Sequence, residues 1–85
     1  MTETTEAQID ELVGKICQIA VDTESYTAAY FDTERALNAF CECVGLDHTK
    51  NEATAIAAHR VIRAFERDDT SSIKGHVKSM LRALA

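Results

Sequence analysis

The sequence predicts an all-α domain, either a compact four-helix bundle or an irregular four-helix fold. Proline is absent from the 85 residues and glycine occurs only three times, so little in the chain interrupts helices. No run alternates polar and apolar residues as a strand does, and no Asn-Gly or Asp-Gly pair marks a hairpin. Four segments instead carry apolar residues at helical spacing, and their short connections favour antiparallel neighbours. We therefore expect one domain spanning residues 1–85.

The first helix is expected at about residues 6–22. Thr5 and Gln8 have the spacing of a capping box, in which each side chain binds the other residue's backbone N–H. The core-facing stripe of this helix consists of Ile9, Leu12, Val13, Ile16 and Ala20.

The second helix is expected at about residues 24–44, and Gly45 is a suitable residue to end it. Asp32 could cap a new helix and break this segment in two. We favour one long helix, because the apolar stripe continues across Asp32. That stripe consists of Tyr26, Tyr30, Thr33, Leu37, Phe40, Cys41 and Val44.

The third and fourth helices are expected at about residues 50–67 and 71–84. Thr49 and Glu52 have the spacing of a second capping box, and Asp69, Thr70 or Ser71 can each cap the fourth helix. The inward residues of the third helix are Ala58, Val61, Ile62 and Phe65, and those of the fourth are Ile73, Val77, Met80, Leu81 and Leu84.

Composition limits the class of protein. The net charge is −5, which works against non-specific binding of nucleic acid. The three cysteines cannot all pair within one chain, which favours reduced thiols in a cytoplasmic protein. The acidic N-terminus has no apolar run behind it, so we expect no signal peptide, and no stretch is apolar enough to suggest a membrane span.

The charges are distributed unevenly, and the basic half of the chain arranges them in stripes. Residues 1–45 hold nine acidic side chains against two basic ones, whereas residues 46–85 hold seven basic against five acidic. Arg60, Arg63 and Arg67 fall within about 60° of one another on the third helix, nearly opposite its core face. Ile56 falls within the same arc. This face could simply be exposed to solvent, with Ile56 covered by the preceding loop. The functional interpretation is a binding patch that combines an apolar residue with arginines.

Phe31 falls on the polar side of the second helix, beside Asp32 and Glu34. It is either buried against a neighbouring helix or exposed as an aromatic anchor for a partner. The sequence leaves these two interpretations open.

A second basic stripe consists of Lys74, Lys78 and Arg82 on the fourth helix. The acidic first two helices could neutralise it within the molecule. The segment from Ile73 to Leu84, IKGHVKSMLRAL, resembles the recognition helix of LuxR-type DNA-binding domains, in which a lysine and a histidine follow a first valine at the same spacing. The resemblance implies a helix-turn-helix whose second helix enters the major groove, with Lys74, His76, Lys78 and Arg82 toward DNA. It covers about a dozen residues, and Glu66 and Asp68 replace apolar residues that the family has upstream.

No motif indicates catalysis or a metal centre. Cys41 and Cys43 are followed by His48, but two cysteines two apart on a helix point about 160° away from each other and cannot bind one ion. Cys41 is expected in the core and Cys43 partly buried, and His59 and His76 are expected at separate surface or boundary positions. We therefore expect no catalytic residue, no metal and no cofactor.

The leading functional hypothesis is a small acidic all-α module that binds another protein, as an adaptor or an inhibitor. Phage-encoded inhibitors have a similar size and composition. The binding residues would be Ile56, Arg60, Arg63, Arg67 and Phe31. Self-association is a variant, because an acidic half could meet the basic half of a second copy. The alternative is a DNA-binding regulator that uses the third and fourth helices.

Overall fold

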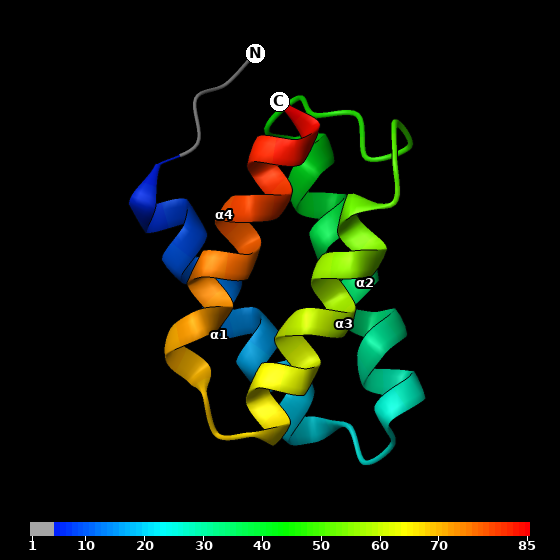
Figure 1. Ribbon diagram of the computed structural model, residues 1–85, viewed down its shortest axis with the longest axis vertical. Helices are drawn as coiled ribbons and strands as arrows, with labels where there is room; N and C mark the ends of the chain where they lie inside the picture. The colour runs from blue at the N-terminus through cyan, green and yellow to red at the C-terminus, as the bar shows by residue number, and fades with distance from the viewer. Residues whose placement is uncertain (1–4) are drawn as a thin grey trace.

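The computed structural model describes residues 5–85, which form the four-helix fold that the sequence predicts (Figure 1). The helices are α1 (Glu6–Asp22), α2 (Tyr26–Cys43), α3 (Ala53–Glu66) and α4 (Ile73–Leu84), with a short 3₁₀ turn, η1 (Thr70–Ser72), directly before α4. The second helix runs unbroken past Asp32, as expected. The all-α prediction is confirmed.

Successive helices run side by side in opposite directions (Figure 1). α3 packs most closely against α2 and α4, and α1 packs against α2 and α4 at the back of the view. The connections α1–α2 and α3–α4 lie at one end of the molecule, and α2–α3 lies at the other. The arrangement is therefore an up-and-down bundle, with extents of 35 × 23 × 17 Å.

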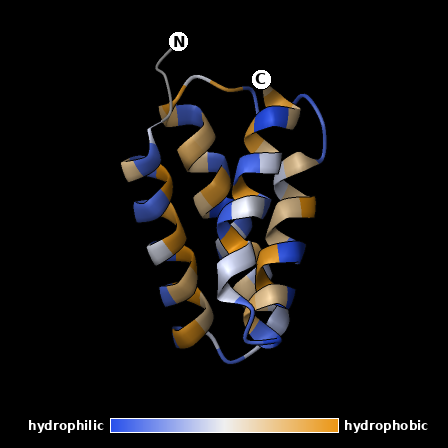
Figure 2. Cartoon of the chain, turned by 60° about the vertical axis from the view of Figure 1, so that its left-hand side comes forward, coloured by the Kyte–Doolittle hydropathy of each residue, from blue (hydrophilic) through white to orange (hydrophobic). Residues whose placement is uncertain are grey.

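Each helix alternates hydrophobic and hydrophilic segments along its length, which is the amphipathic pattern of a bundle (Figure 2). The fully buried side chains come from all four helices and from Val44, which directly follows α2. The largest are Ile16, Leu37, Val44, Val61, Ile73 and Val77. Tyr26, Tyr30 and Phe40, which the sequence places in the core stripe of α2, are only partly buried against this core. The partial burial of these aromatic rings leaves them available at the surface.

The two long helices begin as the sequence indicates. Thr5 and Gln8 form the expected capping box, with the Gln8 backbone N–H 3.2 Å from Thr5 Oγ1 and the Thr5 N–H 2.8 Å from Gln8 Oε1. Ser25 caps α2 by accepting a bond from the Ala28 N–H at 3.0 Å.

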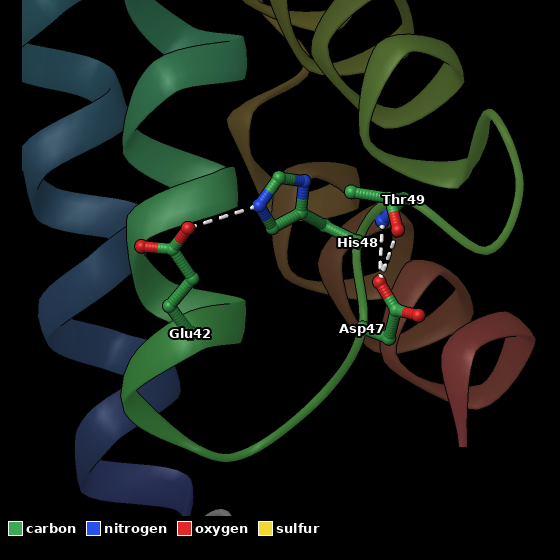
Figure 3. Close-up of polar contacts among 4 residues, drawn as sticks. All are labelled: Glu42, Asp47, His48 and Thr49. Carbon is green, nitrogen blue, oxygen red and sulfur yellow. Dashed lines mark hydrogen bonds and ion pairs between the residues drawn. The ribbon is translucent and has the colours of Figure 1, made fainter.

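The predicted cap of α3 is wrong. α3 begins at Ala53 rather than near residue 50, and Glu52 at its N-cap makes no side-chain capping bond. Thr49 instead donates its backbone N–H and its hydroxyl to Asp47 Oδ1, inside the α2–α3 connection (Figure 3). Asn51 Oδ1 accepts the Ala53 N–H at 2.8 Å, two residues away. Asp47 and Asn51 take these N–H groups in place of the predicted capping box, because their short side chains can accept from the backbone two residues later.

The predicted caps of α4 are also wrong. The chain enters α4 through η1, and Ser72 at its N-cap makes no side-chain capping bond. The oxygens of Asp69 accept bonds from the hydroxyls of Ser71 and Ser72, at 3.1 and 3.0 Å. These polar side chains therefore stabilise the turn rather than the first N–H groups of α4.

Candidate functional site

The arginine stripe lies on the outer face of α3. Val61 and Ile62 are buried on the opposite face and hold the helix against the core. Arg60, Arg63 and Arg67 are exposed, as expected. Within residues 5–85, none of the ion pairs joins any of these guanidiniums to a carboxylate. Three positive charges therefore stand together on an acidic chain.

Two large apolar side chains lie exposed near this stripe. Ile56 is 47% exposed, so the preceding loop does not cover it. Phe31 is 52% exposed, so it is not buried against a neighbouring helix. Its ring meets the Tyr30 ring edge to face, with 5.2 Å between the centroids. For both residues the structure has the exposure that the functional interpretation requires.

A shallow depression of about 320 Å³ lies where α2 meets α3. Tyr30 of α2 lines one side, and Ala55, Ile56, His59 and Arg60 of α3 line the other. We call it the apolar depression. Through Tyr30, which touches Phe31, it connects both exposed apolar residues with the first arginine of the stripe.

His59 is held in place by α2. Its Nδ1 lies 2.5 Å from the Tyr26 hydroxyl, and the two rings pack edge to face with centroids 5.7 Å apart. The contact fixes the His59 ring whether the tyrosine hydroxyl or the imidazole N–H donates the hydrogen bond. Burial raises the pKa of the Tyr26 phenol, so this hydroxyl stays protonated at neutral pH.

A second depression, of about 230 Å³, adjoins the first. It is lined by His59, Arg60 and Arg63 of α3, by Arg67 at the C-cap of α3 and by His76 of α4. We call it the basic depression. His59 and Arg60 line both depressions, so the two form one continuous surface over α2, α3 and the edge of α4. His59 is exposed and His76 is partly buried, as expected, and the fold brings both to this depression.

Two residues of the second basic stripe, Lys74 and Lys78, face a different neighbour, whereas Arg82 is exposed and joins no ion pair within residues 5–85. Lys74 Nζ lies 2.6 Å from Glu6 Oε2 and 2.8 Å from Asp10 Oδ1, and Lys78 Nζ lies 2.8 Å from Glu6 Oε1. Hydrogen bonds from Lys74 and then Lys78 lower the pKa of Glu6 to about 2. Bonds to Asp10 and Glu6 raise the pKa of Lys74. The two lysines therefore bind α1, whereas His76 lies with the arginines of α3, and the two stripes do not form one surface.

α3 and α4 also differ from the arrangement in a helix-turn-helix. In that motif the two helices cross at about 90–120°, which frees the second for the major groove. Here α3 and α4 lie alongside each other in opposite directions (Figure 1). Ile73, Val77, Met80 and Leu84 of α4 are buried in the bundle.

The cysteines and His48 are dispersed. Cys41 is buried as expected, while Cys43 is exposed rather than partly buried. His48 Nε2 lies 3.1 Å from Glu42 Oε1, an interaction that ties the α2–α3 connection to α2 (Figure 3). In the part of the chain that the structure describes, no three His, Cys, Asp or Glu side chains are grouped to hold a metal ion.

One further groove, of about 290 Å³, lies between α1 and α2. Leu12, Phe40 and Val44 line it, and Glu11 and Lys15 lie at its edge with opposite charges. It has the apolar surface of a binding groove but no excess of either charge. The α2–α3 surface combines exposed apolar groups with a single sign of charge, so it is the better candidate site.

The sequence missed three residues of this surface: Tyr26, Tyr30 and His59. His59 and Arg63 are four residues apart on α3, and this spacing could have indicated that His59 lies on the same face as the arginines. The tyrosines were assigned to the core, and only the packing of α2 on α3 shows that Tyr30 lines the apolar depression and that the Tyr26 hydroxyl contacts His59.

Comparisons with protein-family models, curated proteins and solved structures give no match to this chain. Across residues 5–85, no helix has both the length and the apolar composition that crossing a bilayer requires.

Proposed function

We propose that this chain is a protein-binding module that docks a partner through the α2–α3 surface, as an adaptor or as an inhibitor that covers the partner's own binding site. One observation carries the proposal: exposed Ile56 lies in a depression with Arg60, the first of three arginines that pair with no carboxylate of the described residues. Exposed Phe31 packs on Tyr30 at the α2 side of the same depression. Aromatic residues and arginine are enriched at the centres of protein interfaces.

The charge of this surface indicates the chemistry of the partner. The matching segment would place an apolar side chain in the apolar depression and negative groups at Arg60, Arg63 and Arg67. The positive charges would speed encounter and set orientation, and burial of the apolar side chains would supply the affinity. The reduced cysteines fit a cytoplasmic setting for this activity.

A photo-crosslinking amino acid at position 56, in cells that naturally make the chain, tests the proposal. Val21 is also a large exposed aliphatic residue, 67% exposed and on α1, so position 21 is the matched control. We expect a discrete crosslinked protein from position 56 and none from position 21. Crosslinking to the chain itself from position 56 would instead identify a second copy as the occupant.

The purified partner then allows a quantitative test. Ile56→Asp should weaken binding at least ~10-fold, about 1.4 kcal/mol or more, since hot-spot truncations cost that much. Val21→Asp should leave the affinity within about twofold, and circular dichroism should show that both variants are folded. Equal effects of the two substitutions would contradict docking at this surface.

The DNA-binding alternative has a distinct signature. Binding of labelled duplex DNA through the basic residues should fall steeply between about 50 and 200 mM salt. With Lys74 and Lys78 already bound to α1, we expect no duplex binding at the higher salt. Tight binding that Lys74→Gln and Lys78→Gln abolish would favour the regulator over the protein-binding module.

A further inference from the structure

We propose that the basic depression is a binding site for a phosphate monoester, carried by a phosphorylated side chain of the partner protein. The inference rests on the proposed function and specifies which group of the partner the arginines receive. Five side chains that can donate N–H groups line this depression, three from α3, one from the residue that ends it and one from α4, and no carboxylate is among them.

The side chains that line the basic depression come from backbone segments that are anchored in the core. The backbone of α3 is anchored by Val61, Ile62 and Ala64, all buried on its inner side. The Tyr26 hydroxyl fixes the ring of His59 at one end of the depression. His76 comes from α4, one position before Val77, which is fully buried. The site therefore needs little rearrangement of its backbone to receive a ligand.

The number of donors favours phosphate over a carboxylate. A guanidinium forms two parallel hydrogen bonds with an oxyanion, and one such pair already occupies both oxygens of a carboxylate. A phosphate monoester offers three oxygens and a charge of about −1.5 to −2 near neutral pH. Arg60, Arg63 and Arg67, which form no ion pair within residues 5–85, bring three charges to one depression, which a phosphate group uses more fully.

The adjoining apolar depression favours a phosphorylated protein over a nucleic acid. Ile56 precedes Arg60 by four residues and Arg63 by seven, which is about 6 and 10 Å along α3. An extended peptide covers those distances in about two or three residues. A nucleic acid would need a long basic track, whereas Asp68 and Asp69 directly follow Arg67 and the lysines of α4 are bound to α1.

The first experiment titrates the full chain with inorganic phosphate at pH 7.5 and constant ionic strength, followed by amide NMR. We expect saturable shifts around His59, Arg60, Arg63, Arg67 and His76, with a dissociation constant on the order of 1 mM. Acetate should produce no saturable shift. Arg63→Gln should weaken phosphate binding at least ~5-fold, because one charge-assisted bidentate contact is lost. Arg35→Gln is the control, since Arg35 lies on α2 beside Asp32, and it should leave the affinity unchanged.

The second experiment identifies the source of the phosphate. The probes are short peptides with a leucine three residues before or three residues after a phosphoserine. We expect one order to bind at least ~10-fold more tightly than inorganic phosphate, because the leucine adds apolar burial in the adjoining depression. Ile56→Ala should remove most of that gain without changing the affinity for inorganic phosphate, because it deletes apolar surface and adds no charge beside Arg60.

Three results of these binding measurements would overturn the proposal. The first is the absence of saturable phosphate binding, and the second is equal binding of phosphate and acetate. The third is duplex DNA that binds through Arg60, Arg63 and Arg67 while neither phosphopeptide exceeds inorganic phosphate. The phosphate titration needs no protein partner. An unphosphorylated partner captured at position 56 would therefore leave the proposed function standing and refute this inference alone.

Discussion

Asp68 occupies the same position after α3 that Gly45 occupies after α2. Both have positive φ, 59° for Asp68 and 79° for Gly45. At each end, the backbone N–H of this residue and of the next one donate to carbonyl oxygens of the helix. After α2, Gly45 donates to Glu42 and Leu46 to Cys41. After α3, Asp68 donates to Phe65 and Asp69 to Ala64. This is the Schellman motif, which glycine usually completes because it has no Cβ to strain.

The two positions should therefore respond oppositely to substitution. Asp68→Gly should raise the free energy of unfolding by about 0.5–1 kcal/mol, since the left-handed conformation costs a β-carbon about that much. Gly45→Ala should lower it by about 1 kcal/mol for the same reason. Urea denaturation monitored by circular dichroism measures both. A stabilising Gly45→Ala would contradict the strain argument.

The ion pairs between α1 and α4 should make stability depend on pH at the acidic end. The pKa of Glu6 is lowered to about 2 from 4.5, so its contribution is fully present above pH 4.5 and is lost as the pH falls toward 2. The pKa of Lys74 is raised, so its contribution persists through neutral pH and is lost only in strong alkali. We expect wild type to be more stable than Glu6→Gln at pH 6, with the difference vanishing by about pH 2.

Urea unfolding of both proteins at several pH values measures this difference. Glu11→Gln, an exposed carboxylate on the same helix, is the control and should show no such convergence. Added salt should reduce the effect of Glu6→Gln at pH 6, because the pairs are partly exposed. A difference that persists unchanged at pH 2 would show that Glu6 acts through packing rather than charge.

The hydroxyl of Thr33 is buried inside the bundle. Its side chain is fully buried in α2, and within residues 5–85 no group is placed to hydrogen-bond its Oγ1. Thr33→Val replaces the hydroxyl with a methyl group of the same shape, so it removes a desolvation cost without creating a cavity. We expect stabilisation by about 1 kcal/mol in urea denaturation. A loss of similar size would show that the hydroxyl has a partner in solution, such as a bound water.

The three thiols should react at different rates. Cys43 is exposed and Cys17 partly exposed, whereas burial raises the pKa of the Cys41 thiol to about 11. At pH 8 only about one Cys41 side chain in 1,000 would be a thiolate. Reaction with Ellman's reagent should show a fast phase that Cys43→Ser removes, and Cys41 should react only on unfolding. Rapid modification of all three in the folded protein would contradict the burial of Cys41.

The sequence by itself determined the helices and their inward faces. The absence of proline and the spacing of residues such as Ile16, Leu37 and Val77 require amphipathic helices, because burying each apolar face is the main source of stability. The end of α2 just before Gly45 and the start of α1 just after Thr5 follow from local backbone chemistry. The starts of α3 and α4 were missed because several polar side chains compete for the same N–H groups, and helical spacing does not rank them.

Only the tertiary structure decided how charged and exposed residues group together. Periodicity placed Lys74 and His76 on one helix, but packing against α1 and α3 separated them. Lys74 forms an ion pair with Glu6, whereas His76 lines a depression with the arginines. It likewise decided that Ile56 and Phe31 stay exposed. These outcomes depend on contacts between residues far apart in the chain, and a helical repeat carries no information about which neighbour a face will meet.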